Sequence, residues 1–363
     1  MTSFLRERVG FVNFQYFEFL RMLIIYNSIM GLIGMYAQTK HWRFTGIKIT
    51  NSFTISSFFV SEKGSLVFGG LLETVIILIA FVYAKRDRLQ VYPQQSRRQT
   101  LLDEIPTRSL KNERLKKLKR FISALVMSLI ILFVVIAAIL IGNFNIIQAT
   151  PSQLKRYQNY LLASLVALIQ IQSQNICFTL TSIEEHSTWS SWRESYFIKL
   201  LILKIAVTQA SLIGVSINSL TMTNAHCSIP NYAILLIFLS FTLKYTMTMI
   251  SFILYKVGLS KQPEFDLEDE FSGILHKIFI SFSAYFSFPT IGLFVSVLFI
   301  CHFCYLNLCL MYIYKKPIHP SKSLLALVNS SFCTICLLSL ISSRIAFLPG
   351  FVEVFFFNKC LKN

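Results

Sequence analysis

Acidic residues, long polar stretches and enzyme motifs are all scarce in this sequence. Only 17 residues are Asp or Glu, against 34 Lys or Arg. No polar stretch exceeds about 35 residues, so we expect a single transmembrane domain over 1–363 and no separate soluble domain. The chain has no His-Glu zinc motif, no phosphate-binding glycine loop and no paired carboxylates at membrane depth. We therefore do not expect an enzyme.

Features of secreted and metal-binding proteins are also missing. Charged and apolar residues are mixed at the N-terminus and no small-residue cleavage site follows, so we do not expect a signal peptide. Six of the eight cysteines lie in apolar segments, which is typical of small buried side chains rather than of a disulfide framework. We expect no metal and no other cofactor.

Apolar residues are what the chain has in excess. They make up 54% of its 363 residues, and the mean hydropathy is +0.60. A chain so apolar is typical of an all-α multi-pass membrane protein. The net charge of +17 then indicates basic loops that meet anionic lipid, rather than a nucleic-acid partner.

Apolar runs predict about nine transmembrane helices. We place single spans at 16–37, 65–84, 121–141, 157–180, 196–218, 232–255 and 323–343. The remaining apolar run, 276–314, would be about 58 Å long as one helix, nearly twice the bilayer core, so we expect a hairpin. Its turn is predicted at Pro289–Gly292, where a helix should break.

The distribution of basic residues predicts the orientation. The loop 85–120 is strongly basic, and the positive-inside rule places it in the cytosol with the N-terminus, facing the anionic inner leaflet. Its end, 110–120, predicts either a basic helix on the membrane surface or a solvated flank of the next span. The acidic linker 256–270 also falls in the cytosol in this topology. We expect the plasma membrane rather than an internal one.

Lys244 is the most informative single residue. It lies near the middle of the span 232–255, where a charge costs about 3 kcal/mol on insertion scales. Ser240, Lys244, Thr248 and Ser251 share one helical face. Because a polar stripe on a membrane helix faces other helices or water, we expect this face to line a transport pathway.

Neighbouring spans carry further polar residues at helical spacing. Gln170 and Gln174 share a face of the fourth span, which predicts either hydrogen bonds between helices or a water-filled vestibule. Lys204 and Thr208 share a face of the fifth span, and snorkelling of Lys204 to the interface is the alternative there. Glu73, in the second span, is a possible charge partner for either lysine.

Several stretches resemble one family of membrane proteins. The first span resembles that of the transmembrane channel-like (TMC) proteins in its run NFQYFEFLRMLIIYNSIMGLI (Asn13–Ile33). Further similar runs are RLKKLKRFISALVMSLIILFVVIAAILIG, YLLASLVALIQIQSQNICFTLTSIEEHSTWSSWRESYFIKLLILKIA and KQPEFDLEDEFSGILHKIFISFSAYFSFPTIGLFVSVLF. The chain departs from the family pattern before the sixth span, where only Cys227 of a four-residue signature is left. It also has only a short tail, 344–363, in place of a tenth helix.

The resemblance implies a fold, partners and a function. TMC proteins are similar to anoctamins and to osmosensitive channels, so the resemblance implies a homodimer with one pore per subunit and leaves room for auxiliary subunits. It implies a mechanically gated ion channel or a lipid scramblase, with a pore lined by spans four to eight. Carried onto this sequence, the pore face is Gln170, Gln174, Lys204, Thr208, Ser240, Lys244, Thr248, Tyr285 and Asn307.

The charge of this pore face narrows the expected function and leaves alternatives open. Two lysines and no acidic residue fall on the predicted spans four to eight, and basic pores favour anions or phosphate. An anion pathway or a phospholipid scramblase therefore stands beside a TMC-like ion channel. A multi-pass chemosensory receptor is the second alternative, although the hairpin at Pro289 argues against a seven-pass arrangement.

Overall fold

The computed structural model describes residues 11–45, 75, 113–143, 152–186, 188–221, 228–285, 291–314, 324, 327–339 and 341–342. Within them the fold is entirely helical, which confirms the predicted class. The helices are α2 (Phe11–Thr45), α5 (Glu113–Asn143), α6 (Ser152–Ile183), α7 (Trp189–Thr221), α8 (Ser228–Lys256), α9 (Leu267–Tyr285) and α10 (Ile291–Tyr312). A shorter apolar helix, Leu327–Ser339, follows.

Six helices in the described ranges are long and apolar enough to cross a membrane: α2, α5, α6, α7, α8 and α10. The chain is therefore an integral multi-pass membrane protein. The predicted count of about nine is not reached. The expected span 65–84 lies outside the described residues except for position 75, as do 85–112 and the tail 344–363. In the last expected span, 323–343, the helix Leu327–Ser339 is shorter than the other six.

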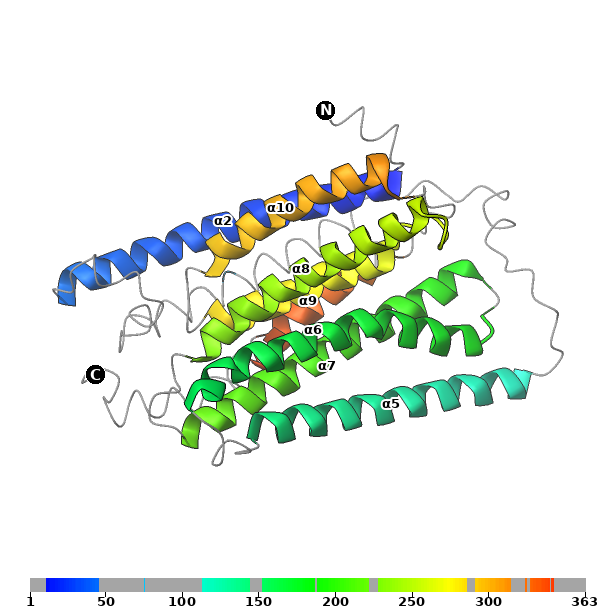
Figure 1. The fold of residues 1–363 in the computed structure, drawn as a ribbon, viewed down its shortest axis with the longest axis horizontal. Helices are drawn as coiled ribbons and strands as arrows, with labels where there is room; N and C mark the ends of the chain where they lie inside the picture. The colour runs from blue at the N-terminus through cyan, green and yellow to red at the C-terminus, as the bar shows by residue number, and fades with distance from the viewer. Residues whose placement is uncertain are drawn as a thin grey trace.

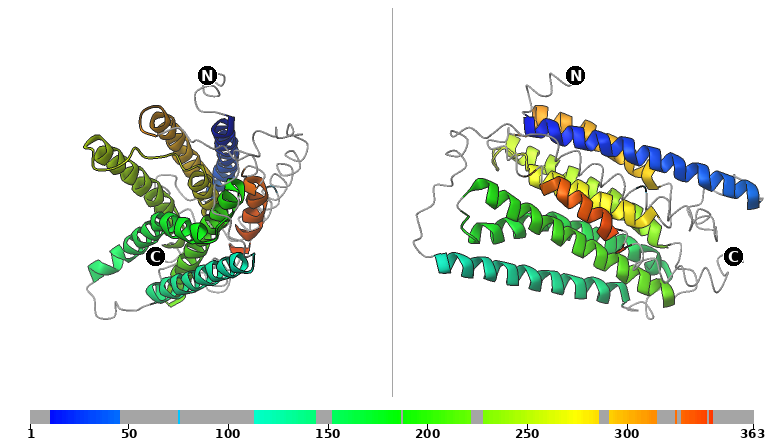
Figure 2. Two further views of the ribbon diagram at one scale, coloured as in Figure 1. Left: turned by 90° about the vertical axis from the view of Figure 1, so that its right-hand side faces the viewer. Right: turned by 180° about the vertical axis from the view of Figure 1, so that it is seen from behind.

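The helices form one elongated bundle with α2 and α10 on one side and α5 at the opposite edge (Figures 1 and 2). Between them lie α8 and α9, and then α6 and α7. The span in α5 is only 11% buried, and its side chains include Phe121 and Phe133, which are 66% and 74% exposed. Such an apolar exposed surface is suited to lipid.

The packing of α2 against α10 is unusually close. Phe17 contacts Phe303 at one end of the pair, and Gly31 lies against Leu293 at the other, so the two helices are antiparallel. A β-carbon built on Gly31 would lie 2.3 Å from the backbone nitrogen of Leu293, so only glycine permits this contact.

The apolar run 276–314 contains two helices, α9 and α10, as the predicted hairpin requires, although of these two only α10 is long and apolar enough to cross a membrane. Tyr16 and Tyr26 of α2 contact Phe271 and Phe282 of α9, so α9 runs parallel to α2 and therefore opposite to α10. α10 begins at Ile291, inside the predicted turn, and residues 286–290 lie outside the described ranges.

The start of α9 corrects the sequence prediction. We expected the helix from His276, but α9 begins at Leu267 and so includes the acidic residues before it. Asp266 caps it, because its carboxylate accepts a hydrogen bond of 3.0 Å from the backbone N–H of Asp269. The acidic residues of the first turn also favour this helix end electrostatically.

Two other helix ends follow local sequence signals. α8 closes with hydrogen bonds from Gly258 N–H to Tyr255 and from Leu259 N–H to Leu254, with Gly258 at φ +82°. This is a Schellman ending, for which glycine is the preferred residue. α5 begins at Glu113 and continues unbroken into its span, so 113–120 is a flank of that span and not a separate surface helix.

Candidate functional site

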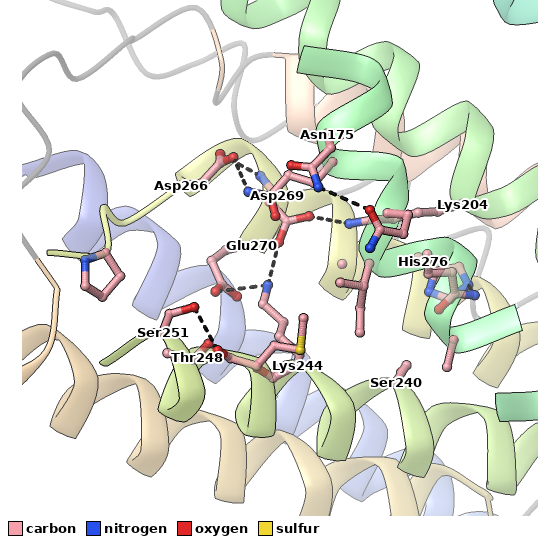
Figure 3. A pocket seen from close by; sticks show the side chains of 18 of the residues that line it. Asn175, Lys204, Ser240, Lys244, Thr248, Ser251, Asp266, Asp269, Glu270 and His276 are labelled. Carbon is pink, nitrogen blue, oxygen red and sulfur yellow. Dashed lines mark hydrogen bonds and ion pairs between the residues drawn. The ribbon is translucent and has the colours of Figure 1, made fainter. Parts of the chain in front are cut away.

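A polar cavity of about 330 Å³ lies among α6, α7, α8 and α9 and is the centre of the candidate site (Figure 3). Its walls carry amides, hydroxyls, lysines and carboxylates, although three of the four surrounding helices, α6, α7 and α8, are long and apolar enough to cross a membrane. The polar lining residues are Gln170, Gln172, Gln174, Asn175, Lys204, Ser240, Lys244, Thr248, Ser251, Glu264, Asp266, Asp269, Glu270, His276, Lys277 and Tyr314.

Lys244 points from α8 across the cavity to the start of α9 (Figure 3). Its Nζ lies 2.8 Å from Oδ2 of Asp269 and 3.0 Å from Oε1 of Glu270. The side chain remains 22% exposed, so the pair borders open space and is not sealed. Two carboxylates thus compensate the charge that makes this residue costly in a membrane.

Lys204 reaches the same aspartate from α7. Its Nζ lies 2.6 Å from Oδ1 of Asp269 and donates a hydrogen bond of 2.9 Å to Ser272. Asp269 therefore binds one lysine with each carboxylate oxygen. Lys204 is only 6% exposed, so its charge is met by Asp269 inside the bundle.

Glu270 connects the cavity to a second buried group behind it. Its other oxygen, Oε2, lies 3.4 Å from Nε2 of His302 on α10. His302 is also within hydrogen-bond distance of the hydroxyls of Tyr16, at 3.0 Å, and Tyr245, at 3.1 Å. The site is therefore held by contacts from α2, α8, α9 and α10 together.

The opposite wall consists of neutral hydrogen-bonding groups. The Gln170 amide donates to Thr208 Oγ1 at 3.0 Å and lies 3.1 Å from Nε2 of His276. Thr208 Oγ1 is 2.5 Å from the same nitrogen. Gln170 therefore makes hydrogen bonds between helices, the first of the two expectations from the sequence, and it also lines the cavity.

Asp266 lies at the end of the cavity where the α8–α9 connection enters (Figure 3). Its carboxylate accepts hydrogen bonds from the Gln174 amide at 3.0 Å and from the Tyr196 hydroxyl at 2.8 Å. These donors are neutral, so they hold the carboxylate in place without neutralising its charge.

Six of the nine predicted pore residues line this cavity: Gln170, Gln174, Lys204, Ser240, Lys244 and Thr248. Thr208 lies behind Gln170. Tyr285 is the last residue of α9, and Asn307 is half-buried on α10 and does not line the cavity. Glu73 lies outside the described residues, and in the described part both lysines pair with α9 instead.

The acidic side of the site is what sequence reasoning missed. We expected no acid on spans four to eight, yet Asp269 and Glu270 lie on α9 and line the cavity. A signal was present in the sequence. Asp266 is a residue type that caps helices, and Asp269, Gly273 and Lys277 follow it at the three- and four-residue spacing of one helical face. Treating the acidic run as a linker outside any helix concealed this pattern.

A second ionic cluster fastens the α6–α7 turn, outside the cavity. Glu184 lies 2.7 Å from Lys199 Nζ and 2.7 Å from His186 Nε2, and Ser195 donates to it at 2.8 Å. Burial alone raises the pKa of Glu184, but hydrogen bonds from His186, Lys199, Ser123 and Ser195 outweigh it and lower the pKa to about 2. The cluster is a structural clasp.

Comparison with known proteins adds no relative to this picture. No protein-family model matches the chain, and no curated protein matches it either. The resemblance to the TMC family therefore stays a prediction from the sequence, and the candidate function depends on the geometry of the cavity.

Proposed function

We propose that this chain forms a TMC-like ion channel, with the cavity between α6 and α9 as part of its conducting pathway. The carrying observation is that Lys244, on a helix long and apolar enough to cross a membrane, borders one polar cavity together with the carboxylates of Asp269 and Glu270. Intramembrane charges of this kind are costly and mark ion pathways more often than they stabilise a fold.

The charge balance of the cavity supports conduction. The lysine charges of Lys204 and Lys244 are met by Asp269 and Glu270, so neither sign dominates this part of the wall. An ion that enters meets hydroxyls and amides able to replace its water.

Threonines on α8 supply a matched test of the pathway. Thr248 lines the cavity, whereas Thr246 lies on the exposed surface of the same helix. In bilayer recordings of the purified protein with defined ion gradients, we expect Thr248→Trp to reduce conductance strongly and Thr246→Trp to leave it unchanged. Equal conductance of both variants and the parent protein would contradict a route through this cavity.

Phospholipid scrambling along the same groove is the second candidate. Gln172 and Asn175 of α6 and Ser251 of α8 line the cavity and are exposed, so polar groups continue from the cavity to the outer surface of the bundle. Such a lateral polar opening suits a lipid headgroup whose tails remain in the bilayer. A fluorescent-lipid assay in proteoliposomes separates the candidates, because a channel gives current without lipid flipping.

A further inference from the structure

Lys277 is the third lysine that lines this cavity, beside Lys204 and Lys244. It lies on α9, lines the cavity and is only 5% exposed. Its Nζ donates a hydrogen bond of 3.2 Å to the carbonyl of Gly273 and lies 4.2 Å from the centre of the Phe241 ring. Both contacts suit an ammonium group, but both partners are neutral.

Lys277 differs from Lys204 and Lys244 because, in the described part of the chain, it is not paired with a carboxylate. Lys204 and Lys244 each contact a carboxylate, and Asp269 already uses both its oxygens on them. Among the residues that the structure describes, no carboxylate lies within 4.0 Å of Lys277. A buried ammonium without a paired carboxylate is costly, and a negative ligand beside it stabilises the charged form over the neutral amine.

Gly273 leaves room for such a ligand. The position that its β-carbon would occupy is 3.6 Å from Nζ of Lys277 and 4.0 Å from Nζ of Lys244. Two ammonium groups therefore converge on the face of α9 where glycine supplies no side chain. An anion beside Gly273 would contact both.

We propose that the cavity binds a monovalent inorganic anion of the chloride type between Lys277 and Lys244, beside Gly273. Lys277 has no paired carboxylate within the described ranges, so its one positive charge matches one negative charge, whereas a divalent anion would leave one charge unmatched beside Asp269 and Glu270. The burial of Lys277 beneath Phe241 favours a small free ion over a phosphate tethered to acyl chains. A role of this anion in conduction rests on the proposed channel function. Binding of the anion does not depend on it.

Binding is tested without any current. Thermal unfolding of the purified protein in detergent is compared in potassium chloride and in potassium gluconate of equal ionic strength. We expect a saturable rise of a few degrees in Tm with chloride, because a ligand that binds only the folded state stabilises it. Potassium sulfate and short-chain phosphatidic acid serve as the divalent and tethered probes, and neither should reproduce the rise.

Three variants locate the effect. Lys277→Met should abolish the chloride-dependent rise in Tm. Gly273→Ala should weaken it, because the added methyl group fills the proposed site at ordinary contact distances and leaves the fold intact. The matched control is Lys256→Met, since Lys256 also lies over an aromatic ring, Phe252 at 5.5 Å, but is exposed at the end of α8. It should keep the full rise.

The outcomes separate the inference from the proposed function. Equal Tm in chloride and gluconate, or an unchanged rise in both Lys277→Met and Gly273→Ala, overturns the anion site even if the protein conducts ions. A chloride-dependent Tm that these variants reduce, with no current in bilayers, supports the site and overturns the channel. Where current flows, its reversal potential in a chloride gradient should follow chloride in the parent protein and shift away from it in Lys277→Met.

Discussion

Nζ of Lys244 lies 2.8 Å from Oδ2 of Asp269, across 25 residues of sequence and from one helix of the bundle to the next. The same aspartate holds Lys204 with its other oxygen. Asp269 is therefore the residue through which α7, α8 and α9 are joined at the cavity, and the proposed pathway runs beside this junction.

Asp269→Asn should destabilise the protein by about 3 kcal/mol or more, because it leaves two lysines with too few counter-charges at a largely buried position. Thermal unfolding in detergent measures the loss as a lowered Tm. The control is Glu18→Gln, which removes an exposed pair with Arg21 at 4.0 Å and should leave Tm unchanged. An Asp269→Asn protein as stable as the parent would show that the junction contributes little.

Gly31→Ala should separate α2 from α10, since the new β-carbon would lie 2.3 Å from the backbone of Leu293 and backbone has little freedom to move away. We expect a clear loss of folded protein in size-exclusion profiles and a lower Tm. Gly273→Ala is the matched control, because its β-carbon meets nothing closer than 3.6 Å. If both variants gave normal profiles, the close contact of α2 with α10 would be refuted.

Much of the fold was predictable because membrane helices are encoded locally. Apolar runs of spanning length indicated α2, α5, α6, α7, α8 and α10, and the break near Pro289 indicated two helices in place of one. The face shared by Ser240, Lys244 and Thr248 also lies on the cavity, since helical periodicity alone brings these residues together.

The acidic half of the site was not predicted, because its partners come from separate helices. Asp269 is 25 residues from Lys244 and 65 from Lys204, and no sequence pattern fixes such pairs. We treated the acidic run as a linker outside any helix, whereas the cap at Asp266 starts a helix that includes it and packs in the bundle. The ion pairs of Asp269 and Glu270 with lysines of α7 and α8 hold these polar residues inside the bundle.

The Glu184 clasp predicts a specific dependence of stability on pH. A carboxyl whose pKa is lowered in the folded state contributes stability above its unfolded pKa of about 4.3, and loses it as the pH falls toward about 2. The contribution is about 3 kcal/mol when fully present. The difference in Tm between the parent protein and Glu184→Gln should therefore be constant above pH 5 and shrink steadily below pH 4.5.

A Glu185→Gln variant is the control for this profile. Glu185 pairs with Lys119 but its side chain is 29% exposed, so its contribution should be small at every pH. A difference between the parent protein and Glu184→Gln that stayed constant down to pH 2.5 would contradict the clasp.

The proposed function requires that water and ions reach the face of α8 that carries Lys244 and Thr248. Cysteine modification during bilayer recording measures this access. A charged methanethiosulfonate reagent is applied to Thr248→Cys, which lines the cavity, and to Met249→Cys as control. Met249 is the next residue of α8 and is 48% exposed. The parent protein corrects for its native cysteines. We expect rapid loss of current in Thr248→Cys alone, and an unchanged current in both variants would exclude a route along this face.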